Sequence, residues 1–387
     1  MSAGTRIAVS AAMLALMIGT AHAQISIKTK TVGTVTNGKP NIDYKNAKPK
    51  TLPIVKSKPL SLRDLLADGA AATFPGVPGY EKGGAGNGKL SPKTIPFSKA
   101  LTDEDGPVTR HEYGVNNHPY TTSVVDNSAS SYNRMSGKLF FNDNGFSFVC
   151  SASLIKTGIV VTAAHCVSAF GERRFHDSFQ FVPAYNKGSA PFGVWTSAHV
   201  RVLASYFDGT DSCAVAGVVC ENDVAVIALK PQNGSYPGVQ TGWYGYGYNG
   251  FGFVNGQTAI TQIGYPVALN GGQEQIRTDS LGVTSASNAN NTVIGSLQTG
   301  GSSGGPWLIN FGQPPRLTSP TGFGAARTRN VVVGTTSWGY TDTTSSGPKE
   351  QGASRFTSAN IDALVTEECL AYPAACSRSV TLQSLDD

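Results

Sequence analysis

The stretch Gly300-Gly301-Ser302-Ser303-Gly304-Gly305-Pro306-Trp307 is the most constrained part of this sequence. Its glycines and proline exclude a helix interior or an ordinary strand, because glycine serves where the backbone takes positive φ angles or approaches other groups closely. A serine in such a turn, surrounded by backbone N–H groups, has the setting of a nucleophile beside an anion site. A Gly/Ser-rich surface loop is the alternative, and the rest of the chain must decide between the two.

A serine nucleophile needs a base to take its proton and a third group to orient that base. His165 follows an apolar run and is flanked by small residues and by Cys166, which leaves room for the imidazole to face a cleft. Asp223 opens the apolar run 223–229. A carboxylate held there can fix the tautomer of an imidazole and stabilise its protonated form. The sequence therefore predicts a catalytic triad of Ser303, His165 and Asp223.

The order of these residues separates two folds. Residues 301–305 also fit the G-x-S-x-G turn of α/β-hydrolases, in which the histidine follows the nucleophile. The last histidine here is His199, so none follows Ser303. Many short apolar runs between turn signals, with few helical periodicities, also favour β-barrels or a β-sandwich. The α/β-hydrolase fold is therefore excluded.

Three motifs, in the order His, Asp, Ser, resemble the trypsin/chymotrypsin-like serine peptidases. They are Ala163-Ala164-His165-Cys166, residues 222–229 and Gly301–Pro306. The chain looks closest to the secreted bacterial branch, which includes glutamyl endopeptidase-like enzymes. The resemblance spans about residues 130–366. It implies an all-β fold with two six-stranded antiparallel β-barrels, at about 130–235 and 236–357. It also implies hydrolysis of peptide bonds through an acyl-enzyme.

The resemblance assigns further residues. Gly301 and Ser303 would supply the N–H groups of an oxyanion hole. The peptide-binding strand would be Ser337-Trp338-Gly339, with Ser337 bonded to Asp223. Leu297 falls where a specificity pocket has its floor, and Gly352 would form a wall, so we expect an apolar P1 residue.

Two positions depart from the family pattern. Ser302 stands where the family usually has an aspartate that pairs with a freed N-terminal amine, so that zymogen switch is not expected. Removal of a prosegment would be the remaining activation route. Thr336 stands where glutamyl-specific relatives carry a histidine, which argues against a preference for glutamate.

The chain outside the resemblance has its own organisation. Residues 1–23 have the pattern of a secretory signal peptide, which predicts an extracellular or periplasmic protein. Residues 24–115 are polar and rich in Lys, Pro and Gly, which predicts a largely irregular prosegment that buries little. The peptidase domain would then span 116–387. A helical pattern predicts a C-terminal helix at about 358–376, capped by Ser358, with Ile361, Leu364, Val365 and Cys369 on one face.

Six cysteines in a secreted chain predict disulfides. They fall into three local couples, which favours Cys150–Cys166, Cys213–Cys220 and Cys369–Cys376, although other pairings remain open. Cys150–Cys166 also fits the disulfide that brackets the histidine in the family. The cysteine and histidine spacings match no zinc motif, so no metal and no cofactor are expected.

The charge pattern bears on partners. The net charge is +5, but the excess of Lys and Arg lies in residues 24–115 and the remainder is close to neutral. We therefore expect a protein or peptide substrate, no nucleic acid, no membrane contact after signal cleavage, and a monomer. The alternative function is a non-catalytic secreted binding protein on the same fold.

Overall fold

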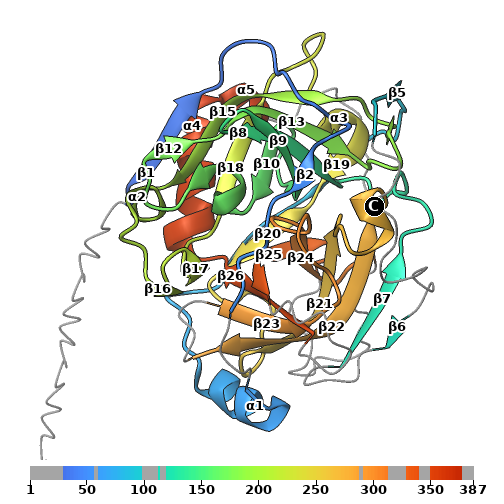
Figure 1. Cartoon of the computed structure of the whole chain (residues 1–387). Coiled ribbons are helices and arrows are strands. Elements are labelled where there is room, and N and C mark those ends of the chain that lie inside the picture. Colours follow the sequence, from blue (N-terminus) through green and yellow to red (C-terminus); the bar gives the residue numbers. More distant parts are fainter. Residues whose placement is uncertain are drawn as a thin grey trace, which may run out of the picture.

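The computed structural model describes residues 29–55, 60–97, 112–113, 119–286, 291–312, 328–339 and 349–376 (Figure 1). The expected signal peptide lies outside these residues. Two β-barrels, one above the other in Figure 1, form the body of the molecule. This arrangement confirms the predicted fold class.

The first barrel closes through six antiparallel strands in the order β15-β13-β8-β9-β10-β18, with β18 pairing back to β15. These strands are β8 (Ser136–Asp143), β9 (Phe146–Leu154), β10 (Ile159–Thr162), β13 (Asp177–Pro183), β15 (Trp195–Leu203) and β18 (Ala225–Leu229). Asn144 and Gly145 join β8 to β9 with φ angles of 50° and 79°. Positive φ at both positions is the requirement of a type I′ hairpin, which Asn-Gly satisfies.

Short helices and strands lie in the connections between the strands of this barrel. They are η1 (Ala164–Cys166), β11 (Ser168–Ala169), β12 (Arg174–Phe175), β14 (Ser189–Ala190), α2 (Ala204–Asp208), β16 (Cys213–Val215) and β17 (Val218–Cys220). The three predicted disulfides, Cys150–Cys166, Cys213–Cys220 and Cys369–Cys376, are all present.

The second barrel closes in the order β21-β24-β25-β26-β23-β22, with β22 pairing back to β21. Its strands are β21 (Gln257–Gly264), β22 (Ile276–Ser285), β23 (Asn291–Gly295), β24 (Pro306–Ile309), β25 (Val331–Gly339) and β26 (Glu350–Arg355). Strands β6 (Glu112–Tyr113), β7 (Tyr120–Val124) and β20 (Gly245–Tyr248) extend its sheet, and η2 (Asn270–Gly272) lies between β21 and β22. α3 (Gly238–Thr241) and β19 (Gly242–Trp243) belong to the connection between the barrels and contact the first one.

Strand β18 explains how the barrels are held together. Side chains alternate across a strand, so one strand can supply two cores. Ala225, Ile227 and Leu229 point into the core of the first barrel. Val226 and Ala228 instead join the cluster between the barrels, which also contains second-barrel residues. The continuous apolar run 224–229 therefore reflects burial on both faces.

The C-terminal helix has its N-cap one residue before the predicted cap. It consists of η3 (Ser358–Asp362) and α4 (Ala363–Ala371), followed by α5 (Pro373–Cys376). Thr357, and not Ser358, is the N-cap, because its side chain accepts from Asn360 N–H while Asn360 bonds back to Thr357 N–H. This reciprocal capping box satisfies two backbone donors that the helix leaves unpaired. The predicted apolar face is confirmed for Ile361, Leu364 and Val365, which are buried.

The described part of residues 24–115 is largely irregular and buries few side chains, as predicted, but it contacts both barrels, which composition did not predict. This segment contributes β1 (Thr31–Val35), β2 (Lys48–Pro49), α1 (Leu62–Ala71), β3 (Gly79–Glu81), β4 (Gly84–Ala85) and β5 (Lys93–Thr94). β1 pairs with β15 of the first barrel, while α1 contacts β21 and β22 of the second. Leu52, Leu65 and Ile95 are buried. The segment is irregular in composition, but its few apolar residues are used at separate contacts.

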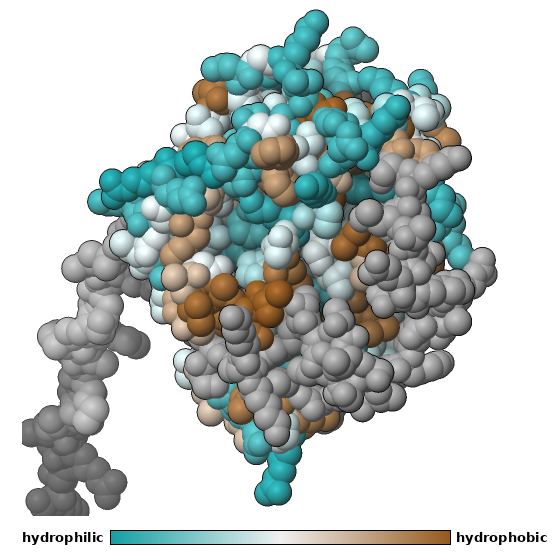
Figure 2. Space-filling model, viewed as in Figure 1, coloured by the Kyte–Doolittle hydropathy of each residue, from teal (hydrophilic) through white to brown (hydrophobic). Residues whose placement is uncertain are grey.

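The exterior differs between the two halves of one face. In Figure 2 hydrophilic side chains dominate the upper part of this face, and hydrophobic side chains gather below its middle. None of the helices in the described residues is both long and apolar enough to cross a membrane.

Lys138 on β8 of the first barrel is a buried lysine that contacts the loop after β21 of the second barrel. It donates to Gly272 O at 2.7 Å and lies over the rings of Phe140 and Tyr185. Burial lowers the pKa of Lys138 from 10.5 to about 7. Below pH 7 both the folded and the unfolded states are therefore protonated at this lysine, and the folded state bears the full cost of a buried charge.

We expect Lys138→Met to change stability in a pH-dependent way. Between about pH 7 and 10 the unfolded lysine binds more protons than the folded one, so the wild type gains stability as the pH rises. The free energy of unfolding of the variant, minus that of the wild type, should therefore fall across this window in denaturant titrations. The exposed Lys89→Met is the control and should show a constant difference. If the free energies of unfolding of wild type and Lys138→Met changed with pH in the same way, the lowered pKa of Lys138 would be contradicted.

Candidate active site

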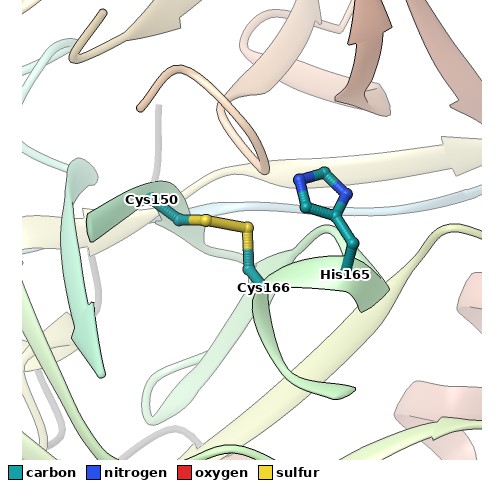
Figure 3. A group of neighbouring side chains, drawn as sticks. All are labelled: Cys150, His165 and Cys166. Atoms are coloured by element: carbon teal, nitrogen blue, oxygen red, sulfur yellow. A yellow bond between two sulfur atoms is a disulfide. The ribbon is translucent and has the colours of Figure 1, made fainter. Parts of the chain in front are cut away.

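His165 lies in η1, the short turn after β10, and the Cys150–Cys166 disulfide ties this turn to β9. Figure 3 shows the imidazole beside that disulfide. The histidine and the two cysteines are close enough to resemble a metal site. Both sulfurs are bonded to each other, however, so neither is available as a thiolate ligand. The cluster is therefore a brace for the histidine turn.

The carboxylate of Asp223 orients His165. It accepts hydrogen bonds from the backbone N–H of His165 at 2.8 Å and from its Nδ1 at 2.7 Å. Ser337 Oγ of β25 donates a third at 2.6 Å. Asp223 is only 2 % exposed, and a buried carboxylate is stable only when donors surround it. Because Nδ1 donates, Nε2 is left as the proton acceptor.

Ser303 sits between two glycines with positive φ, Gly301 at 93° and Gly304 at 78°. A Cβ atom at Gly304 would collide with Thr162 Oγ1, and one at Gly301 would collide with Tyr265 O. The glycines are therefore needed both for backbone conformation and for close approach. Thr162 ends the strand before the His165 turn, so the structure brings the serine turn against the histidine turn.

The hydroxyl of Ser303 and Nε2 of His165 are both buried, and neither has a hydrogen-bond partner among the described residues. The structure therefore joins His165 to Asp223 but does not join Ser303 to His165 by a hydrogen bond. Ser303 itself is 0 % exposed. A buried hydroxyl without a partner is costly, which marks this position as one that is kept for a purpose other than stability.

Ser151 on β9 controls the orientation of the serine turn. Its Oγ donates to Gly301 O at 2.8 Å, and its N–H donates to Ser303 O at 2.7 Å. Tyr265 N–H donates in turn to Ser151 Oγ at 2.9 Å. With these carbonyls turned away, the N–H groups of Gly301 and Ser303 donate to no acceptor within the described part of the chain. Two such free donors side by side suit an anion.

Sequence reasoning missed Ser151, although it directly follows the disulfide residue Cys150. The feature that makes it important is its position opposite the serine turn, which no local pattern encodes.

Ser302 is fixed by neutral polar groups. Its Oγ donates to Thr299 O at 2.7 Å and accepts from Gln351 Nε2 at 3.3 Å. Gln351 Nε2 also donates to Gln298 O, and Gln351 Oε1 accepts from Gln262 Nε2. Gln262 Oε1 accepts in turn from Ser296 Oγ, so these side chains form one buried network. Hydrogen bonds between side chains therefore occupy the place at which the family usually has an aspartate. Gln351 is a second residue that the sequence did not reveal.

The expected pocket residues lie in several settings. Trp338 and Gly339 are on β25, opposite Gly352 and Gln351 of β26. A side chain at Gly352 would collide with the indole of Trp338, so glycine is required there. Leu297 is half-buried and follows β23. The roles of Leu297 and Gly352 in a specificity pocket stay predictions.

A family model described as Trypsin matches residues 123–360. The chain is similar to the thermostable serine protease AL20 from an extremophilic microorganism, with 26 % identity over 64 % of this chain and 100 % of that chain, at a TM-score of 0.49. It is also similar to protease Anisep from Arthrobacter nicotinovorans, with 22 % identity, 64 % and 98 % coverage and a TM-score of 0.47.

A Glu endopeptidase shows 19 % identity, 64 % and 96 % coverage and a TM-score of 0.45. No curated protein sequence matches the chain significantly.

We expect Ser151→Ala to lower the acylation rate of Ser303 roughly tenfold, because the turn that presents the Gly301 and Ser303 N–H groups loses its brace. The KM for a peptide substrate should change little, while the melting temperature should fall, because Gly301 O and Tyr265 N–H both lose a buried hydrogen-bond partner. Ser153→Ala is the matched control: it lies two residues along β9, is buried, and its hydroxyl has no partner among the described residues. Equal effects of the two substitutions on kcat, measured on secreted material, would contradict a positioning role for Ser151.

Proposed function

Because this chain belongs to the trypsin family, we propose that it is a serine endopeptidase that hydrolyses peptide bonds through Ser303, His165 and Asp223. Ser303 Oγ attacks the scissile carbonyl, and His165 Nε2 takes the proton and returns it to the leaving amine. Water then hydrolyses the acyl-enzyme by the same route. Asp223 keeps Nδ1 protonated and stabilises the imidazolium.

One observation carries this proposal: a buried carboxylate bonded to both the Nδ1 and the backbone N–H of His165. This arrangement directs an unprotonated Nε2 toward the site, as a general base requires. The unbonded N–H groups of Gly301 and Ser303 support it further. They can receive the negative charge that develops on the carbonyl oxygen, and a donor of this kind typically contributes ~3 kcal/mol to transition-state stabilisation.

Active-site labelling tests the role of Ser303. A fluorophosphonate probe should label secreted wild-type protein and Ser302→Ala, while Ser303→Ala should take up no label and His165→Ala very little. Ser302 is a stringent control, because it is the adjacent serine and its hydroxyl is already bonded to Thr299 O. Equal labelling of wild type and His165→Ala, or no label on Ser303, would favour a non-catalytic binding protein on the same fold.

We further propose that the P1 preference is apolar. Leu297 at the expected pocket floor carries no charge, and Gly339 and Gly352 add no polar side chain. A lysine or glutamate at P1 would therefore enter the pocket without a charged partner.

Peptide substrates that differ only at P1 test this preference. We expect kcat/KM for Leu or Phe to exceed that for Lys, Arg or Glu by about tenfold or more, because an unpaired buried charge costs at least ~1.4 kcal/mol. A clear preference for Arg, Lys or Glu would refute the assignment of an apolar pocket.

The working environment follows from the sequence and the disulfides. We propose a protein that is secreted, extracellular or periplasmic, after cleavage of residues 1–23. Three disulfides suit an oxidising compartment. We propose that the protein acts as a monomer on a protein or peptide substrate, and that it requires no nucleic acid, membrane or cofactor.

A further inference from the structure

The segment before the family domain crosses the face between the two barrels. In Figure 1 it is drawn in blue and runs from the first barrel through β2 to helix α1 below the second barrel. The residues that cross are 48–55. They lie outside the stretch that matches the trypsin family, residues 123–360, so the family gives no role for them.

The segment is anchored on the first barrel just before it crosses. Tyr44 packs edge-on against Phe140, with ring centroids 5.1 Å apart, and its hydroxyl bonds to Gln180 Oε1. Lys50 Nζ pairs with Asp143 Oδ2 at 2.8 Å, and Lys50 N–H donates to Val149 O at 2.9 Å. Residues 48 and 49 pair in parallel with Phe148 and Val149 of β9, directly before the disulfide residue Cys150.

The crossing itself lies on the candidate active site. The Cβ of Pro49 is 3.6 Å from the position that a Cβ atom would take at Gly301. The carbonyl oxygen of Lys50 is 3.2 Å from the same position at Gly300. This segment therefore lies against the start of the turn that carries Ser303, and Ser303 itself is fully buried.

Leu52 then enters the region of the expected specificity pocket. It is 2 % exposed, and its Cδ2 lies against Gly339, on the strand expected to run beside a substrate. Gly339 N–H donates to Pro53 O at 3.0 Å, and Val55 N–H donates to Gly339 O at 3.3 Å. Val55 packs on the cluster that contains Trp338. The segment thus uses both the backbone and the apolar surface of this strand.

The segment occupies the cleft without being presented for cleavage. Acylation requires a carbonyl oxygen at the N–H groups of Gly301 and Ser303. Neither group donates to any carbonyl of the segment in its described part. The bridge between Ile54 and Gly339 is parallel, so the segment runs in the same direction as β25.

We propose that residues 48–55 are a built-in peptide inhibitor of this cleft, with Leu52 as its pocket residue. The inhibitory role rests on the proposed function, because it requires an active Ser303. The contact itself does not. The partner that this surface fits is therefore an extended peptide with a proline, a leucine and a lysine at the spacing of Pro49, Lys50 and Leu52, which the chain supplies itself.

Labelling of the intact chain tests the inhibition. A fluorophosphonate should label intact, uncut Leu52→Asp at least about tenfold faster than intact wild type, because the aspartate removes an apolar contact of leucine size. Leu370→Asp is the matched control, since Leu370 is 71 % exposed on α4. Excess synthetic peptide of residues 41–55 should slow labelling of the Leu52→Asp chain again. The same peptide carrying Asp at position 52, and the sequence-reversed peptide, should not.

Equal labelling rates for intact wild type and Leu52→Asp, or cleavage of the 41–55 peptide as a substrate, would overturn the proposal.

Hydrogen exchange of the Gly339 and Val55 amides on a Ser303→Ala background separates the binding of residues 48–55 in the cleft from the peptidase function of Ser303. These amides should be protected, and Leu52→Asp should release them. Protection without any labelling of Ser303 in any variant would leave a bound segment but refute both the peptidase and its inhibition. Fast exchange in both chains would refute the contact alone.

Discussion

The buried carboxylate of Asp223 is the interaction on which the site depends. A charge in this position is unfavourable unless donors surround it. Here the donors come from both barrels: two from His165 in the first and one from Ser337 in the second. The need to satisfy one carboxylate therefore fixes the histidine turn, the start of β18 and the middle of β25 relative to one another.

A second set of hydrogen bonds also links the two barrels, this time with the donors on the first barrel and the acceptors on the second. Ser151 of the first barrel holds the carbonyl groups of the serine turn, which belongs to the second. Neither barrel alone contains a complete site. Since the residues that meet are 114 positions apart for Asp223 and Ser337 and 150 for Ser151 and Gly301, their contacts form only once both barrels have closed, which is typical of folds dominated by long-range pairing.

The sequence predicted the features that local patterns encode. The Asn144-Gly145 hairpin, the three local disulfides and the buried face of the last helix each depend on residues close together in the chain. The resemblance added the two barrels and brought His165, Asp223 and Ser303 into one hypothesis. Sequence reasoning missed Ser151, Gln351 and the burial of Leu52, because their value comes from partners that are distant in sequence. It predicted correctly that residues 29–97 bury little, but not where they lie, since composition reports how much can be buried and not where a few apolar residues will be used.

Strand β1 gives the N-terminal segment a hold on the molecule that is remote from the cleft. It adds five residue pairs to β15, and α1 provides a further contact on the second barrel. A segment held at several points behaves as a multivalent ligand, whose local concentration stays high even after one covalent link is lost. A single cut after this segment would thus leave a nicked complex. Its departure would be governed by dilution and by digestion of the segment itself, which would introduce a delay between processing and the appearance of an accessible cleft.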